Sequence, residues 1–144
     1  MNETRVEEAP PADSRGIDEI LAEARTRIQR VNPSTAHHEH AESGAILVDI
    51  RPEAQRLAKG MIPDALIIER NVLEWRFDPR CEARLPIANT YGLRVIVFCQ
   101  EGYTSSLAAA SLQDLGLARA TDMEGGFKAW RDAGLPTVGV PEGS

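Results

Sequence analysis

The stretch that decides the fold is Val95-Ile-Val-Phe-Cys-Gln-Glu-Gly-Tyr-Thr-Ser105. Its first four residues are apolar and favour extended backbone, so they predict a buried strand that stops at Cys99. A short polar loop follows, and any of the three hydroxyl residues at 104–106 could cap a helix that is predicted from Leu107 onward. Cys99 is therefore expected at the carboxyl end of a buried strand, in front of a helix amino terminus. Open α/β folds place their chemistry at such positions.

This position suits a reactive thiolate. A helix amino terminus presents unpaired N–H groups and a positive dipole end, and a tight loop containing Gly102 can turn further N–H groups inward. Such surroundings favour the anionic, nucleophilic form of cysteine. The alternative is a buried structural cysteine that ends a core strand, because free cysteine is among the most buried residue types. The spacing alone leaves both interpretations open.

Length and composition indicate one ordinary globular domain. With 144 residues, 42% of them hydrophobic and 26% charged, the chain is large enough to bury a core. The net charge of −6 argues against nucleic acid or an anionic membrane as a partner. No apolar run approaches the roughly 20 residues of a membrane span, and the amino terminus has no apolar signal core. Two cysteines, Cys81 and Cys99, are too few for a disulfide framework or a thiolate metal cluster, so a cytoplasmic protein with reduced thiols is expected.

The chain before the main domain divides into two parts. Residues 1–15 are acidic and contain prolines with almost nothing to bury, which predicts a disordered acidic tail. Residues 16–30 predict an N-terminal amphipathic helix. Its apolar positions recur at helical spacing and are Ile17, Ile20, Leu21, Ala24 and Ile28.

Strands and helices are expected to alternate through the rest of the chain. Asn32-Pro33 predicts a helix start, as cap and first helical residue, and a weakly apolar helix is expected to run to Gly44. Residues 77–94 read as a long surface connection. Further strands are predicted at 46–50, 65–68 and, most weakly, 120–123, and short helices at 52–58, around Leu73 and after Gly125-Gly126. This alternation predicts an α/β domain with three layers, α/β/α, and a mainly parallel central sheet.

Three histidines lie in the weakly apolar helix. His37 and His40 are three residues apart and would share a helix face, as metal ligands can, with His38 beside them. No thiolate or further histidine is available to complete a coordination sphere. We therefore expect a solvated polar face and no metal site.

Several short motifs follow one another in a recognisable order. They are Asp49-x-Arg51 with Glu53, Gly60-x-Ile62-Pro63-x-Ala65, Cys99-x-x-Gly102 and Gly125-Gly126-x-x-x-Trp130. In this order, and with strands and helices in the matching places, the sequence resembles a single rhodanese (sulfurtransferase) domain over roughly residues 31–138. On this resemblance, residues 31–144 form a rhodanese-like domain.

The resemblance implies a persulfide-forming sulfurtransferase. Cys99 would take sulfane sulfur from a small-molecule or protein persulfide donor and pass it to a thiol or other nucleophilic acceptor. A persulfide is a good leaving group and needs hydrogen-bond donors around its charge, which backbone N–H groups of the loop would supply. No metal or organic cofactor is expected. The substrate-binding loop would consist of Gln100, Glu101, Gly102, Tyr103, Thr104 and Ser105.

Two loop residues depart from the family pattern. Many rhodaneses carry Arg at the position of Thr104, where it can bind an anionic donor such as thiosulfate. Thr104 has no charge, and Glu101 adds a carboxylate to the same loop. Thiosulfate is therefore expected to be a poor donor.

The residues also allow other functions and roles. One is a rhodanese-like binding or regulatory module with little turnover. Another, less favoured, is a cysteine-dependent phosphatase or arsenate reductase, because tyrosine-phosphatase-type loops need Arg six residues after the nucleophile, where this chain has Ser105. Asp49 and Arg51 either support the cysteine loop or form an ordinary pair at a strand end. Cys81 could resolve a Cys99 persulfide as a disulfide, although a free loop cysteine is the simpler expectation, and the sequence predicts no oligomeric state.

Overall fold

Two mostly apolar runs form the centre of the sheet. β1 (Ile46–Asp49) and β3 (Val95–Phe98) pair in parallel along their whole length. The structure is a computed structural model that describes residues 6–141. It places two short parallel strands, β2 (Leu66–Ile67) and β4 (Thr121–Asp122), at the two edges, so that the sheet order is β2-β1-β3-β4. Burial of these central strands on both faces explains why every residue of the two runs except Asp49 is apolar.

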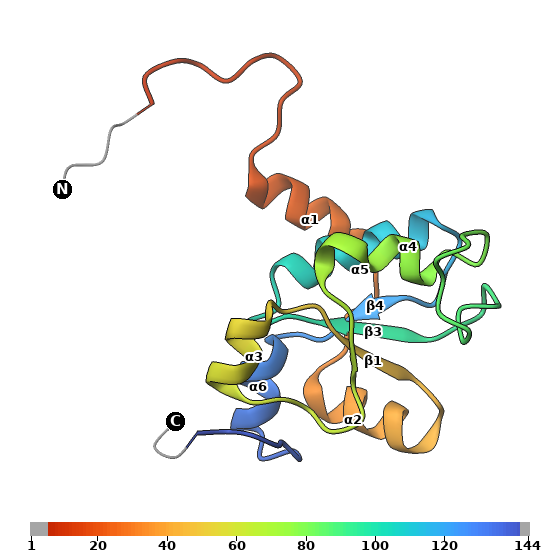
Figure 1. The fold of residues 1–144 in the computed structure, drawn as a ribbon. Helices are drawn as coiled ribbons and strands as arrows, with labels where there is room; N and C mark the ends of the chain where they lie inside the picture. The colour runs from red at the N-terminus through yellow and green to blue at the C-terminus, as the bar shows by residue number, and fades with distance from the viewer. Residues whose placement is uncertain (1–5, 142–144) are drawn as a thin grey trace.

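Helices cover both faces of the sheet. They are α1 (Ile17–Arg27), α2 (Pro33–Glu42), α3 (Glu53–Lys59), the 3₁₀ turn η1 (Arg70–Val72), α4 (Leu73–Phe77), α5 (Thr104–Asp114) and α6 (Gly126–Asp132). Figure 1 shows α1, α4 and α5 on one side of the sheet and α2, α3 and α6 on the other. The predicted three-layer α/β/α fold with a parallel central sheet is confirmed.

The side chains of β3 alternate between two buried clusters. Val95 and Val97 belong to the cluster on the α4 and α5 side of the sheet, and Cys99 belongs to the same cluster. Ile96 and Phe98 belong to the other cluster, together with the two aromatic residues of α6. Successive residues of a strand face opposite sides. Cys99 therefore continues the face of the strand that packs against α5.

Helix α1 packs on α5 through the second half of its apolar face. Ala24 and Ile28 are buried, whereas Ile17 is 65% exposed. Helix α1 thereby lies in the same layer as α5 (Figure 1). Residues 6–16 are exposed and have no helix or strand, and residues 1–5 of the expected acidic tail lie outside the described residues.

Two helix starts show how local chemistry sets the boundaries. Asn32 caps α2 as predicted, because its side-chain oxygen accepts a hydrogen bond from the Thr35 N–H at 2.8 Å. The prediction for α5 is wrong by three residues, since this helix begins at Thr104 and not at Leu107. None of the expected hydroxyl caps is used. Tyr103 occupies the cap position without a side-chain hydrogen bond, and the hydroxyls of Ser105 and Ser106 bond elsewhere.

The long connection between α4 and β3 consists of turns over residues 78–94, as the sequence predicts. It is anchored by the fully buried Ala88. Near the other end of the chain, Met61 and Val138 form an isolated antiparallel bridge. Within residues 6–141, no helix has the length and apolar character needed to cross a membrane.

The burial of α1 leads to a stability prediction. Ile28 is 5% exposed and Ile17 is 65% exposed, although both belong to the same apolar pattern. We expect Ile28→Ala to lower the free energy of unfolding by about 2–5 kcal/mol, as buried Ile→Ala changes do. Ile17→Ala should stay within about 0.5 kcal/mol of the wild type. Chemical denaturation measures both, and equally small losses would show that α1 is not part of the cooperative fold.

Candidate functional site

Cys99 follows the last residue of β3 and is 7% exposed. Four residues separate it from Thr104, where α5 begins. Within this turn the Gly102 N–H donates to the Cys99 sulfur, with 3.2 Å between N and Sγ. Gly102 adopts a φ of +88°, which glycine tolerates far better than other residues. The loop thus directs a main-chain donor at the sulfur, where an N–H group stabilises an anionic form.

The first turn of α6 bonds the carbonyl groups at the start of the loop. The Phe127 N–H donates to the Cys99 carbonyl at 2.9 Å, and the Lys128 N–H donates to the Gln100 carbonyl at 3.0 Å. This close approach requires Gly126, because a Cβ atom there would lie 2.4 Å from the Cys99 carbonyl oxygen. The Gly125-Gly126 motif therefore allows α6 to fix the main chain on which Cys99 lies.

Asp49 and Arg51 form a buried pair at the end of β1, and the pair also reaches the loop. Arg51 Nη2 donates to Asp49 Oδ2 at 2.7 Å. Its Nη1 donates to the Gln100 side-chain oxygen at 2.9 Å. The guanidinium lies 4.3 Å from the centre of the Phe127 ring. The two roles considered from the sequence, pairing and loop contact, thus occur together.

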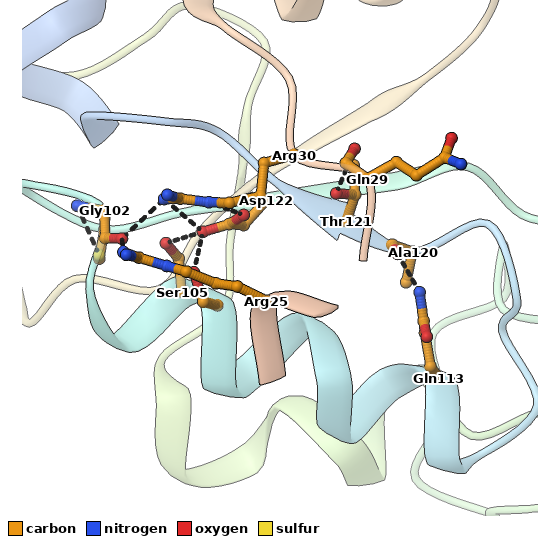
Figure 2. A network of polar contacts seen from close by, with 11 residues as sticks. Arg25, Gln29, Arg30, Gly102, Ser105, Gln113, Ala120, Thr121 and Asp122 are labelled. Carbon is orange, nitrogen blue, oxygen red and sulfur yellow. Dashed lines mark hydrogen bonds and ion pairs between the residues drawn. The ribbon is translucent and has the colours of Figure 1, made fainter. Parts of the chain in front are cut away.

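A second buried carboxylate lies at the end of β4. Asp122 is fully buried, and its Oδ2 accepts hydrogen bonds from the Ser105 and Ser106 hydroxyls, each at 2.8 Å. Arg30, which follows α1, donates from Nε to Asp122 Oδ1 at 2.9 Å. Buried charges are tolerated when they are paired and hydrogen-bonded. This network, drawn in Figure 2, attaches the first turn of α5 to β4 and to the chain after α1.

The Gly102 carbonyl is bonded from outside the loop. Arg25 and Arg30 each donate from Nη2 to this oxygen at 2.8 Å. Figure 2 shows both side chains reaching Gly102 from the α1 segment. Arg25 also donates from Nε to the Ser106 hydroxyl at 3.0 Å. Gly102 therefore has its N–H on the Cys99 sulfur and its carbonyl on two guanidinium groups.

The rest of the predicted loop faces outward. Glu101 and Thr104 are exposed, and Tyr103 is 62% exposed. A hollow of about 310 Å³ lies beside these residues, lined by Glu101, Tyr103, Gly125, Lys128, Ala129 and Asp132. A larger hollow of about 480 Å³, lined by arginines that include Arg94 and Arg119, lies at the opposite end of β3. Of these two hollows, the one lined by Glu101 and Tyr103 is the one next to the Cys99 loop.

The other chemically notable residues lie apart from the loop. Cys81 is a free, half-buried cysteine in the connection after α4, and it lines a small hollow with Trp75 and Leu115. The His37 ring packs edge-on against Trp130, with 5.3 Å between the ring centres. His40 Nδ1 lies 2.8 Å from the Ala45 carbonyl oxygen. Across residues 6–141, no three or more His, Cys, Asp or Glu side chains are grouped as a metal site.

Sequence reasoning missed Asp122, Arg25 and Arg30. Asp122 was detectable from the sequence, because it is a polar residue one position before the end of the strand predicted at 120–123, and the carboxyl ends of parallel strands meet at one edge of a sheet. Arg25 and Arg30 could not be singled out in the sequence, because cations are common near the end of an amphipathic helix. Their contacts depend on how the helix docks.

The Asp122 network predicts a large and specific loss of stability. Asp122→Ala removes the acceptor of two buried hydroxyls and of Arg30. We expect the free energy of unfolding to fall by about 3–5 kcal/mol, as when one partner of a buried pair is removed. The control is Asp114→Ala, which removes an exposed partner of Arg27 and should cost about 0–1 kcal/mol. Similar losses for the two variants, measured by urea denaturation, would contradict the structural role given to Asp122.

Comparison with known proteins identifies relatives by sequence. The sequence profile of the rhodanese-like domain matches residues 33–133. A sulfurtransferase from Allochromatium vinosum is 37% identical over 98 residues, which cover 68% of this chain and 81% of that protein. The thiosulfate sulfurtransferase GlpE of Pseudomonas savastanoi pv. phaseolicola is 30% identical over 106 residues, covering 74% of this chain and 90% of that protein.

Solved structures share the fold. A Rhodopseudomonas palustris protein, described as of unknown function and a possible tyrosine phosphatase, is similar with a TM-score of 0.78 and 35% identity. The match covers 90% of this chain and 99% of that one. The polysulfide-sulfur transferase of Wolinella succinogenes is similar in fold with a TM-score of 0.65 and 20% identity, over 84% of this chain and 85% of that one. With the profile match over most of its length, the chain belongs to the rhodanese-like domain family.

Proposed function

We propose that the protein is a rhodanese-type sulfurtransferase that carries sulfane sulfur as a persulfide on Cys99. The observation that carries the proposal is the hydrogen bond from the Gly102 N–H to the Cys99 sulfur, at 3.2 Å. Relatives named sulfurtransferase at 37% and 30% identity support the same reaction class. Cys99 is 7% exposed, so a small part of the residue is open to a reaction partner.

The first half of the reaction is an exchange at sulfur. The Cys99 thiolate attacks the outer sulfur of a persulfide donor, a new S–S bond forms, and the old S–S bond of the donor breaks. The electron pair leaves with the donor thiolate, so the chain now carries the sulfur as a Cys99 persulfide. The Gly102 N–H, which bonds Cys99 Sγ, would stabilise the thiolate before attack and again when it leaves, and the negative outer sulfur of the persulfide would need further loop N–H groups.

The second half passes the sulfur on. The acceptor thiolate bonds to the outer sulfur, the bond to Cys99 breaks, and the Cys99 thiolate leaves with the electron pair. The acceptor becomes a persulfide, and the enzyme returns to its starting state. Both halves are displacements at sulfur without net oxidation. The loop residues therefore need only to stabilise the anionic sulfur and to leave access for the donor first and the acceptor second.

The direct test is the mass of the intact protein after incubation with a panel of persulfide and polysulfide donors. We expect one added sulfur on the wild type, removed again by an excess of a thiol acceptor. Cys99→Ser should gain none, because its hydroxyl is far less ionised. Cys81→Ser is the matched control and should behave as the wild type.

Each alternative function has its own signature in these assays. Sulfur that is taken up but not passed to any thiol would favour a binding or regulatory module. Phosphatase activity would appear as hydrolysis of an aryl phosphate that is lost in Cys99→Ser. The structure offers that activity little support, because Ser105 stands at the position where phosphatase loops need Arg and is buried against Asp122. Normal sulfur uptake without release in Cys81→Ser would replace this mechanism with one in which Cys81 attacks the Cys99 persulfide, forms a disulfide and releases hydrosulfide.

The outward side of the loop predicts the preference among donors. Thr104 and Glu101 are both exposed, and neither offers a cation to a doubly charged donor. We expect thiosulfate to be a poor donor and Thr104→Arg to raise kcat/KM for thiosulfate at least about tenfold, which corresponds to about 1.4 kcal/mol. At about 4 Å near a surface, one unit charge contributes up to about 4 kcal/mol before salt screening, so the gain is physically available.

The matched control is Thr90→Arg, which adds the same charge at an exposed residue before β3, at the opposite end of the strand from Cys99. It should leave kcat/KM for every donor unchanged. A neutral donor should gain little from Thr104→Arg. A wild type that already prefers thiosulfate, or an Arg variant that gains nothing, would overturn this account of donor preference.

A further inference from the structure

Helix α1 lies before the matched family region, yet one of its side chains reaches the Cys99 loop. Arg25 bonds two neighbouring parts of the site with one guanidinium group. Its Nη2 donates to the Gly102 carbonyl at 2.8 Å, and its Nε donates to the Ser106 hydroxyl at 3.0 Å. The same group lies 5.8 Å from the centre of the Tyr103 ring. Arg25 therefore contacts the loop and the first turn of α5 together (Figure 2).

Gly102 is the residue whose orientation these bonds determine. Glycine has no side chain to fix it, and its main chain is the most permissive of all residues. The positive φ of Gly102 and its N–H bond to the sulfur must therefore be maintained by its other contacts. On its carbonyl side, those contacts are the two arginines.

The two arginines differ in how their charge is balanced. Arg30 forms a salt bridge with the buried Asp122. Arg25 has no carboxylate partner within the part of the chain that the structure describes. Its guanidinium bonds a main-chain carbonyl of the loop and a hydroxyl that in turn bonds Asp122. The charge of Arg25 strengthens its hydrogen bond to the Gly102 carbonyl, the group through which it acts on the loop.

Docking of α1 does not depend on Arg25 alone. Arg27, two residues further on, pairs with Asp114 and donates to the Ala110 carbonyl at 3.3 Å, both near the far end of α5. Ala24 and Ile28 bury the apolar face of the helix. The Arg25 contacts are therefore the ones from α1 that are directed at the loop and the start of α5.

From these contacts we infer that Arg25 is a positioning residue for sulfur transfer. It acts through the Gly102 main chain, which it keeps oriented with the N–H on the Cys99 sulfur. This inference rests on the proposed function. Part of the site then lies on a helix outside residues 33–133. Loss of Arg25 should lower kcat with every donor and should not act through the binding of one class of donor.

The test compares three variants with neutral and anionic donors. Arg25→Gln should lower kcat for sulfur transfer about tenfold with every donor, the scale of a lost charge-assisted hydrogen bond, with KM within about twofold. Arg25→Lys keeps the charge but can replace only one of the two bonds, so its kcat should lie between those of the wild type and Arg25→Gln. Arg27→Gln is the matched control, and its kcat should stay within about twofold of the wild type. Should Arg25→Gln fail to fold, Arg25→Lys carries the comparison.

A second measurement works without turnover. In a Cys81→Ser background, the rate of alkylation of Cys99 by iodoacetamide near neutral pH reports on the anionic sulfur. Arg25→Gln should slow it, and Arg27→Gln should not. If the wild type accepts sulfur from no donor, the proposed function fails while this rate still tests the role of Arg25. Equal alkylation rates and equal kcat for the Arg25 and Arg27 variants would overturn the inference. An effect of Arg25→Gln that is confined to KM for the anionic donor would also overturn it, because Arg25 would then be a donor-binding residue.

Discussion

The Asp122 carboxylate is fully buried, and Ser105, Ser106 and Arg30 are the side chains that bond it. Removing a carboxylate from water costs several kcal/mol unless such partners are present, so these four groups must stay together for the fold to persist. They belong to three separate parts of the chain: the end of β4, the first turn of α5 and the segment after α1. The Cys99 loop spans the gap between β3 and α5. Asp122 therefore holds the α5 end of this loop in place through Ser105 and Ser106.

The sheet order explains why strands on both sides of β3 contribute contacts to the Cys99 loop. β3 lies between β1 and β4, and all three strands are parallel. Each neighbouring strand ends in a buried Asp, and each Asp pairs with an Arg. Arg51, on the β1 side, bonds the Gln100 side chain, whereas Arg30, on the β4 side, bonds the Gly102 carbonyl. The two arginines thus bond the loop at two of its residues, and α6 bonds the carbonyl groups of Cys99 and Gln100.

The sequence predicts much of this arrangement, and the failures have physical causes. The apolar run before Cys99 and the alternation of strands and helices predict the fold, because burial on both faces leaves a clear pattern. The start of α5 was misplaced because serines at a helix start usually act as caps, whereas here the hydroxyls of Ser105 and Ser106 bond a carboxylate from another strand. The contacts of Arg25 could not be predicted from the sequence for a similar reason. They depend on how α1 docks, and an apolar stripe does not specify the neighbour on which it will pack.

In the proposed mechanism, the main chain of the loop presents hydrogen-bond donors to a sulfur carried by Cys99. A crystal structure of the protein after treatment with a persulfide donor tests this most directly. The account predicts an outer sulfur atom bonded to Cys99 Sγ and within hydrogen-bond distance of the loop N–H groups, with Gly102 still bonded through its carbonyl to Arg25 and Arg30. An outer sulfur on Cys81, or one on Cys99 that is turned away from the loop N–H groups, would contradict it.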